Sequence, residues 1–328
     1  MEVLQEKLAE GNVYARMYLT CAEIEEAGSP QQAISATVER FAGERELGQL
    51  LFPRVLTMDW DNDMNLSFTL EAAVKPAVEL EDYRGMEVYV PAGEERESVI
   101  QEAVVKKLRA CIPSVLLDRK MEVLLMQVKA EIADKSRYTT LSDMYAMLRD
   151  GDEALGTGRA EEELWQAARE LAEEYLGQRG AESTPEDLIA ALADILVPEG
   201  ADDEQIEKLD ACVSRRSQQR GMDSAEELVN QCFACYLRAE EVDEEEMMEG
   251  LRATAEEQVR IELLLDTVAE RENIEVTREE TEQALMSIGE MYGLDHTSVL
   301  EMVNQDSLLF QLRRDKARTY LATQVKVV

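Results

Sequence analysis

The sequence predicts an α+β protein that is predominantly α. A small α+β domain at residues 1–91 is followed by an elongated multi-helix body with arms at residues 92–328. Two observations predict this class. Apolar and small polar residues alternate through residues 66–74, which is the period of a half-buried strand. The remainder is rich in Leu, Ala, Glu, Arg and Met, and the chain has only 16 Gly and 7 Pro, a composition typical of long helices.

The first 91 residues are predicted to contain a strand, a helix and two further strands. Residues 13–20 fit the first strand. Ser29 and Pro30 are typical of the N-cap and first position of a helix. Residues 66–74 fit the next strand, and an extended turn at Lys75-Pro76 leads to a last strand that ends at Pro91. The helix should place four apolar residues on one face: Ala33, Ile34, Val38 and Phe41. This order is typical of a small α+β domain.

From residue 94 onward apolar residues recur at helical spacing, and the helices show a weak internal repeat. Short apolar helices end at Ile112-Pro113 and at Val197-Pro198, 85 residues apart. The repeat predicts that residues 137–235 are an insertion or a duplication within the body. Helices rich in Glu and Leu also resemble one another without true repetition, so both interpretations stay open.

The charge of the chain restricts its partners. With 34 Lys and Arg against 70 Asp and Glu, the net charge is −36. Nucleic acids and anionic membrane surfaces are therefore not expected partners, because both are bound by clustered basic residues. The sequence contains no apolar run as long as a membrane span and no signal-peptide pattern. We expect an acidic, cytoplasmic protein.

The residues that usually carry chemistry are sparse. His296 is the only histidine, and neither a Gly-x-Ser-x-Gly elbow nor a phosphate-binding glycine loop is present. Cys232 and Cys235 form a C-x-x-C pair, with Cys212 upstream. Such a pair can carry redox or zinc chemistry. Its spacing equally fits two small core residues on one face of a helix. The acidic run at residues 240–246 lacks the ligand spacing of a calcium loop and fits a helix start. We predict no enzymatic activity, no cofactor and no metal site.

Several segments, in order, resemble the trigger factor family of bacterial folding chaperones. Residues 64–91 are similar to the end of its N-terminal domain and the linker that follows. Residues 98–132 are similar to the opening half of its C-terminal domain. Residues 256–277, 291–293 and 316–321 are similar to the closing half. The resemblance touches roughly half of the chain, and it implies a helical body like the trigger factor C-terminal domain.

Two features of the family are not matched. The family docks on the ribosome through a basic loop containing Gly-Phe-Arg, whereas residues 23–30 here are acidic and short. The family also carries an FKBP-type prolyl isomerase domain after the linker. Here only residues 92–97 separate Pro91 from the first predicted helix of the body, and a domain needs about 50 residues or more. The resemblance therefore implies neither ribosome docking nor isomerase activity.

The resemblance implies an ATP-independent chaperone, or holdase, that binds exposed apolar segments of non-native proteins in a helical cradle. We call such proteins clients. The alternative is a dedicated assembly or scaffolding factor for one protein partner. A homodimer is compatible with either interpretation.

Methionine suits adaptable binding surfaces because its thioether is flexible, although at helical spacing it also fills cores. The candidate client-binding residues are Met121, Leu125, Met144, Met147, Met247, Met248, Met286 and Met291.

Overall fold

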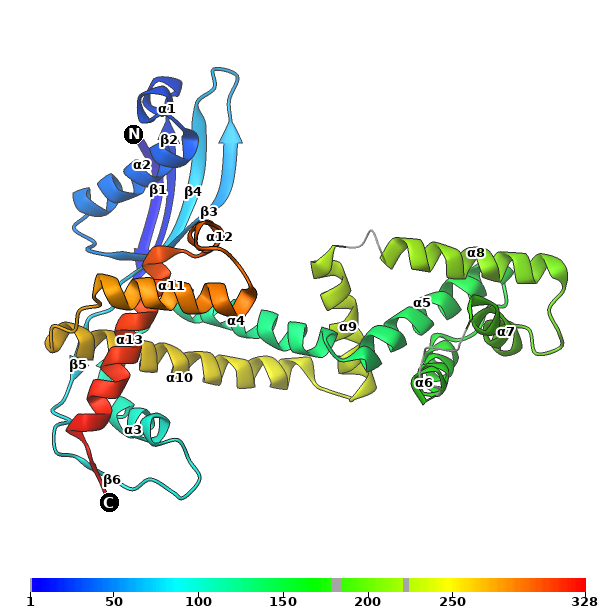
Figure 1. Cartoon of the computed structure of the whole chain (residues 1–328). Helices are drawn as coiled ribbons and strands as arrows, with labels where there is room; N and C mark the ends of the chain where they lie inside the picture. The colour runs from blue at the N-terminus through cyan, green and yellow to red at the C-terminus, as the bar shows by residue number, and fades with distance from the viewer. Residues whose placement is uncertain (1, 178–183, 221–223) are drawn as a thin grey trace. The chain divides into compact units, whose positions relative to one another are not determined.

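The computed structural model describes residues 2–177, 184–220 and 224–328, and the chain divides into two compact units. Unit 1 combines residues 1–121 with residues 252–328, and unit 2 comprises residues 122–251. The helices α4 (Ser114–Ala133) and α10 (Glu244–Arg271) each contribute residues to both units (Figure 1). The predicted class, α+β and predominantly α, is confirmed.

Unit 1 begins with an antiparallel sheet whose strands lie in the order β1-β2-β4-β3. The strands are β1 (Glu2–Ala9), β2 (Asn12–Leu19), β3 (Leu50–Trp60) and β4 (Leu66–Val74). In the two central strands, β2 and β4, buried side chains alternate with more exposed ones, so each strand presents one face to the core. The prediction located β2 and β4 but assigned no strand to β1 or β3.

Helices α1 (Cys21–Ala27) and α2 (Pro30–Glu44) pack on the buried face of this sheet. Ser29 caps α2 by accepting a hydrogen bond from the backbone N–H of Gln32, and Pro30 occupies the first position, as predicted. Only Gly28 and Ser29 lie between the two helices. The predicted apolar face of α2 contributes to the sheet core, in which Phe41 is fully buried.

A linker of short strands follows the sheet. β5 (Val78–Leu80) pairs with β7 (Leu108–Ala110), and β6 (Glu87–Val88) pairs in parallel with β8 (Lys326–Val327) at the C-terminus. In place of the single strand predicted to end at Pro91, the structure has two short strands, β5 and β6. Seven residues, 89–95, separate the end of β6 from the start of helix α3 (Arg96–Val105).

The linker is held to the helices of unit 1 by a polar cluster around Glu272. The buried Tyr83 donates a hydrogen bond to this carboxylate at 3.3 Å. Arg84 donates another at 2.6 Å, and Tyr320 donates a third at 2.9 Å. Hydrogen bonds, first of all from Tyr320, lower the pKa of Glu272 below its usual value.

The base of α4 is attached to the sheet. The side chain of Asn12 accepts a hydrogen bond from the Val115 backbone N–H at 2.9 Å, and Arg119 pairs with Glu71 at 2.7 Å. A Cβ at Gly11 would lie 2.8 Å from Pro113, and Gly11 has a φ of +79°. Glycine therefore provides both the turn conformation and the room for this contact.

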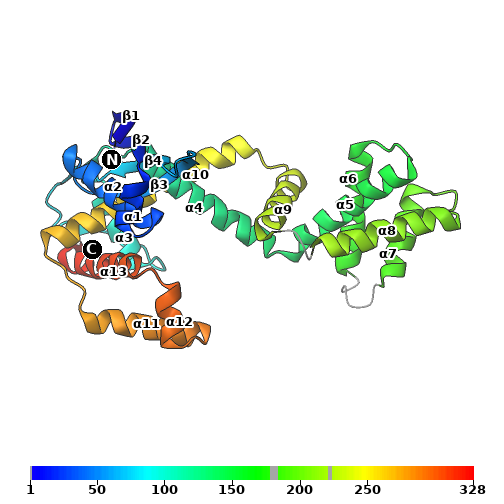
Figure 2. The same ribbon diagram turned by 90° about the horizontal axis from the view of Figure 1, so that it is seen from above.

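The described residues of unit 2 form helices joined by loops. Its core is formed by α5 (Ser136–Leu155), α6 (Glu161–Gly177), α7 (Pro185–Leu196), α8 (Asp203–Arg220) and α9 (Ala225–Ala239) (Figure 2). Helix α5 packs against each of the other four. Its Asp143 accepts a buried hydrogen bond at 3.2 Å from Arg216 of α8. The domain boundary at residue 91 and the insertion or duplication at residues 137–235 stay predictions.

Candidate functional site

The C-terminal helices of unit 1 expose apolar side chains. They are α11 (Arg278–Tyr292), α12 (His296–Met302) and α13 (Gln305–Gln324). Met291 and Met302 are 76% and 72% exposed. The other large exposed apolar residues of these helices are Met286, Tyr292, Leu300, Leu309 and Phe310. We call these seven residues the C-terminal apolar set.

Polar caps fix the turns that present this set. Thr277 and Glu280 form a capping box at the start of α11, and Gly293 ends the helix in the left-handed conformation. Asp295 caps α12 by accepting hydrogen bonds from the backbone of Thr297 and Ser298. His296, the first residue of α12, is exposed.

The far end of α13 is anchored in the core of unit 1. Ala317, Leu321 and Val325 are buried with apolar residues of α3 and α10. Arg314 forms two hydrogen bonds with Asp266 of α10, at 2.8 and 2.7 Å. One end of α13 is thus fixed by packing and by charge, while the other end carries Leu309 and Phe310 at the surface.

A groove of about 570 Å³ separates α11 from α13. Ala284 and Leu312 contribute apolar walls, and Lys316 of α13 pairs with Glu280 of α11 at 2.8 Å. The hydrogen bond from Lys316 lowers the pKa of Glu280. The groove has apolar walls beside this ion pair.

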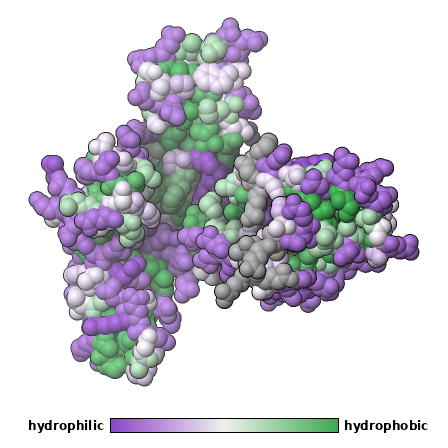
Figure 3. Space-filling model, turned by 45° about the vertical axis from the view of Figure 1, so that its right-hand side comes forward, coloured by the Kyte–Doolittle hydropathy of each residue, from purple (hydrophilic) through white to green (hydrophobic). Residues whose placement is uncertain are grey.

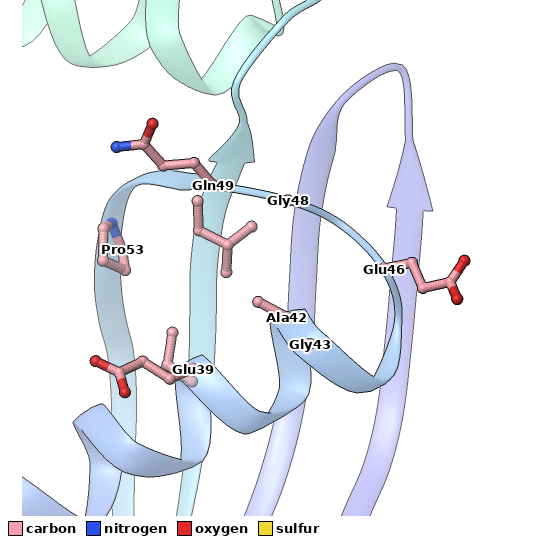
Figure 4. Close-up of a pocket in the computed structure, with 9 residues that line it drawn as sticks. Glu39, Ala42, Gly43, Glu46, Gly48, Gln49 and Pro53 are labelled. Carbon is pink, nitrogen blue, oxygen red and sulfur yellow. The ribbon is translucent and has the colours of Figure 1, made fainter.

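A second groove, of about 670 Å³, lies between α2 and the start of β3. Ala42 and Gly43 line it from the helix and Pro53 from the strand (Figure 4). Its two carboxylates, Glu39 and Glu46, point away from each other in Figure 4. They therefore do not form the close pair that general acid–base chemistry uses.

The predicted client-binding residues fall into three groups. Met286 and Met291 are exposed on α11. Met144 and Met147 are only 3% and 7% exposed in the core of unit 2, so in this structure they fill the core instead of lining a surface. The remaining four are half-buried: Met121 and Leu125 on α4, and Met247 and Met248 on α10. A client-binding role for any of them stays a prediction.

Sequence reasoning did not select Tyr292, Met302 or Phe310 as client-binding residues. Tyr292 and Met302 are the last residues of α11 and α12, and Phe310 lies in the second turn of α13, so each has fewer neighbours within its own helix than a central residue has. Gly293 and the capping residues Asp295 and Asn304 mark where these helices end and begin, and they were the only sequence signal for these exposed positions. Figure 3 shows hydrophobic residues interrupting the hydrophilic surface on the face in view.

Three of the five cysteines behave as small core residues. Cys212, Cys232 and Cys235 are buried, and burial raises the pKa of Cys235 to about 11. A thiol with so high a pKa is a poor nucleophile at neutral pH. The described part of the chain holds no group of three or more His, Cys, Asp or Glu side chains arranged to bind a metal.

None of the helices described by the structure is long and apolar enough to cross a membrane.

Comparison with known proteins identifies the family of the chain. The family model of the bacterial trigger factor C-terminus matches residues 160–324, which covers α6 through α13. The chain belongs to the trigger factor family. The resemblance inferred from the sequence is thereby confirmed.

Individual trigger factors also match the chain, although each match covers less than half of the relative. The trigger factor of Bacillus thuringiensis (strain Al Hakam) is 26% identical over 182 residues, which is 55% of this chain and 40% of that protein. Trigger factors of Bacillus cereus (strain AH820) and Bacillus anthracis (strain A0248) match with the same identity and coverage. The matched region thus spans less than half the length of these relatives.

A solved structure described under "Promiscuous Substrate Recognition in Folding and Assembly Activities of the Trigger Factor Chaperone" is 12% identical. The likeness covers 99% of this chain and 100% of that one, with a TM-score of 0.34. A score this low supports no statement about this protein.

Proposed function

We propose that this protein is an ATP-independent chaperone of the holdase type, which binds exposed apolar segments of non-native proteins. The observation that carries the proposal is the C-terminal apolar set, exposed on helices within the part of the chain that matches the trigger factor family. A monomeric soluble protein rarely exposes many large apolar side chains in one short region unless they bind something.

The energetics fit weak and reversible capture. Each apolar client side chain gains about 1.5–3 kcal/mol when it is fully buried. Ordering the client and its side chains offsets much of this gain. Stable capture therefore needs several contacts at once, and release needs no ATP because no single contact is strong. The net charge of −36 keeps a complex soluble and favours neutral or basic clients.

We propose that the protein neither docks on the ribosome nor catalyses prolyl isomerisation. Only Gly28 and Ser29 connect α1 to α2, so there is no room between these helices for a basic docking loop. Residues 89–95 are all that separates β6 from α3, which leaves no room there for an isomerase domain. We also propose a cytoplasmic location and a function that requires no cofactor.

The test is suppression of aggregation by the purified protein, measured by light scattering with several unrelated denatured clients. We expect delayed aggregation at near-stoichiometric ratios. If one cellular protein alone is protected, the protein is instead a dedicated assembly factor. If no client is protected, the chaperone proposal is wrong.

Matched variants locate the activity. Tyr292 of α11 and Tyr89 of the linker are 69% and 71% exposed, so their replacement by glutamine removes similar surface. We expect the double variant Tyr292→Gln/Met291→Gln to lose protection and Tyr89→Gln/Met126→Gln to keep it. Equal protection by the two double variants would place client binding outside the C-terminal apolar set.

A further inference from the structure

The hairpin between β3 and β4 carries a pattern that the proposed function does not use. Residues 58–61 read Met-Asp-Trp-Asp, so apolar and acidic side chains alternate along the end of β3. Met58 and Trp60 are exposed, Trp60 by 44%, although both belong to a strand of the sheet. Large side chains on a strand are normally covered, and an exposed Trp is typical of an interaction surface.

The strand that carries this pattern is at an edge of the sheet. β3 pairs with β4 on one side and has no strand partner on the other among the described residues. An edge of this kind can accept an additional strand from another polypeptide.

The backbone N–H and C=O groups that this edge presents for pairing are those of the apolar residues Met58 and Trp60. Asp61 donates a backbone hydrogen bond to Asn65 at 3.0 Å, and at the other end of the pair Lys75 donates to Gln49 at 2.9 Å. Hydrogen-bonded pairs alternate along an antiparallel ladder. Both bonds indicate that Asp59 points its backbone N–H and C=O groups toward β4. Met58 and Trp60, which alternate with it, therefore point their N–H and C=O groups away from β4.

The two faces of the strand differ in character. Met58 lies opposite Phe68 and Trp60 opposite Leu66, so both share the face that the core uses. Asp59 lies opposite Ser67 on the polar face. A strand added at this edge would meet apolar side chains on one face and a carboxylate on the other, in alternation.

The rest of β3 is protected against strand addition. The register shifts between Leu51 and Arg54, where Pro53 also lacks an N–H, and shifts again between Val55 and Thr57. Bulges and prolines are common means of closing an edge. Regular pairing resumes at Thr57, which leaves residues 57–60 as the open stretch.

The hairpin is held rigid by its own turn. Asp61 accepts hydrogen bonds from the backbone and side chain of Asn65, and Tyr18 donates another to it at 3.2 Å. Asp59 faces Arg16 at 3.5 Å, and both side chains of this pair are well exposed. An exposed pair of this length is weak, so Asp59 can exchange it for a cation on an added strand.

We propose that residues 57–60 of β3 bind an extended, basic segment of another polypeptide, in which apolar residues alternate with Lys or Arg. The segment adds to the sheet as a strand that pairs with the backbone of Met58 and Trp60. Its apolar side chains cover these two residues, and a cation lies beside Asp59 on the polar face. The site is in the sheet, apart from the C-terminal apolar set, and it does not rest on the proposed chaperone function.

The chain supplies its own probe for the test. Trp60 and the buried Trp165 are its two tryptophans, so Trp165→Phe leaves Trp60 as the single reporter of the hairpin. We expect a short peptide of alternating valine and lysine to shift its emission to shorter wavelength at low salt. The wild-type chain with a dye-labelled peptide, followed by anisotropy, gives the same measurement without relying on the folding of the variant.

Three control peptides test the three parts of the proposal. One has the same residues with the lysines in a block, one has glutamate for lysine, and one is N-methylated on the amides that would pair with β3. We expect each to bind at least about tenfold more weakly than the alternating peptide. Equal binding of the blocked or the N-methylated peptide would overturn strand addition, and equal binding of the glutamate peptide would overturn the charge match.

Variants of the protein complete the test. Asp59→Lys and Met58→Thr should each weaken binding of the alternating peptide by about tenfold. Glu94→Lys, a change at an exposed residue of the linker, should have little effect on binding. Absence of binding by the wild-type chain at millimolar peptide would refute the site. Aggregation assays with Asp59→Lys should match the wild type, which separates this site from the proposed chaperone surface.

Discussion

Unit 2 and the C-terminal helices of unit 1 use the same residue types for opposite purposes. Both contain methionines at helical spacing, yet Met144 and Met147 are buried in unit 2 while Met291 and Met302 are exposed. The difference lies in the neighbours: α5 packs against four other helices, whereas the tip of α11 is covered mainly by the short α12. Exposure is therefore decided by how many elements meet a helix, which no periodicity within that helix reveals.

The charged pairs of the two regions differ in the same way. Arg216 and Asp143 form a buried pair between α8 and α5 in unit 2. Lys316 and Glu280 form a partly exposed pair between α13 and α11. The first is surrounded by protein and the second is screened by water, so their removal should have unequal consequences.

The largest effect should come from breaking the buried pair. Arg216→Met removes a guanidinium that donates to the buried Asp143 carboxylate, and we expect a loss of about 3–5 kcal/mol in the free energy of unfolding. Denaturant unfolding followed by circular dichroism measures it. The double variant Arg216→Met/Asp143→Leu should recover most of the loss, because the buried carboxylate is then removed together with the guanidinium that donates to it. If the double variant is as unstable as the single one, the pair is not the cause.

The second largest effect should come from truncating a buried methionine, compared with truncating an exposed one. Met144→Ala creates a cavity in the core of unit 2 and should cost about 2–5 kcal/mol. Met291→Ala removes an exposed side chain and should change stability by no more than about 0.5 kcal/mol. Equal losses in thermal and denaturant unfolding would contradict the assignment of one methionine to the core and the other to the surface.

Close packing in unit 2 leads to a third prediction. A Cβ at Gly151 of α5 would lie 2.8 Å from Leu196 and 2.9 Å from Leu209, both buried. Gly151→Ala should therefore destabilise the protein by about 1–3 kcal/mol through overpacking. Gly250→Ala is the control, because a Cβ there meets nothing within 4 Å and the helix should gain about 0.5–1 kcal/mol. A stabilising Gly151→Ala would show that this core has room to adjust.

Local signals in the sequence were enough to place some elements and not others. The cap at Ser29-Pro30 and the alternation of residues 66–74 were predicted because each depends only on nearby residues. Residues 2–9 contain several good helix formers, and they become β1 only through pairing with β2, so tertiary contacts override propensity. β3 contains Pro53, which argues against a strand unless a bulge accommodates it, as happens here.

The candidate site was only partly predictable for the same reason. Composition indicated methionine-rich surfaces and selected Met286 and Met291, which are exposed. It selected Met144 and Met147 equally, because the helices that bury them come from residues up to about a hundred positions away. Tyr292 ends its helix and Phe310 lies in the second turn of its helix, and the sequence alone does not indicate which other helices pack near them.

The smallest effect should come from the partly exposed pair of the C-terminal helices. The hydrogen bond from Lys316 lowers the pKa of Glu280 in the folded protein, so the unfolded state binds a proton more readily. The stabilisation is therefore complete above the unfolded pKa of about 4.3 and is lost as pH falls through the lower folded value. Lys316→Met should lower stability at pH 7 by less than Arg216→Met does, and the difference from wild type should shrink toward pH 3. Denaturant unfolding at the two pH values, with and without added salt, measures this. A difference that grows on acidification would mean that Lys316 acts through packing against the groove instead of through the charge of Glu280.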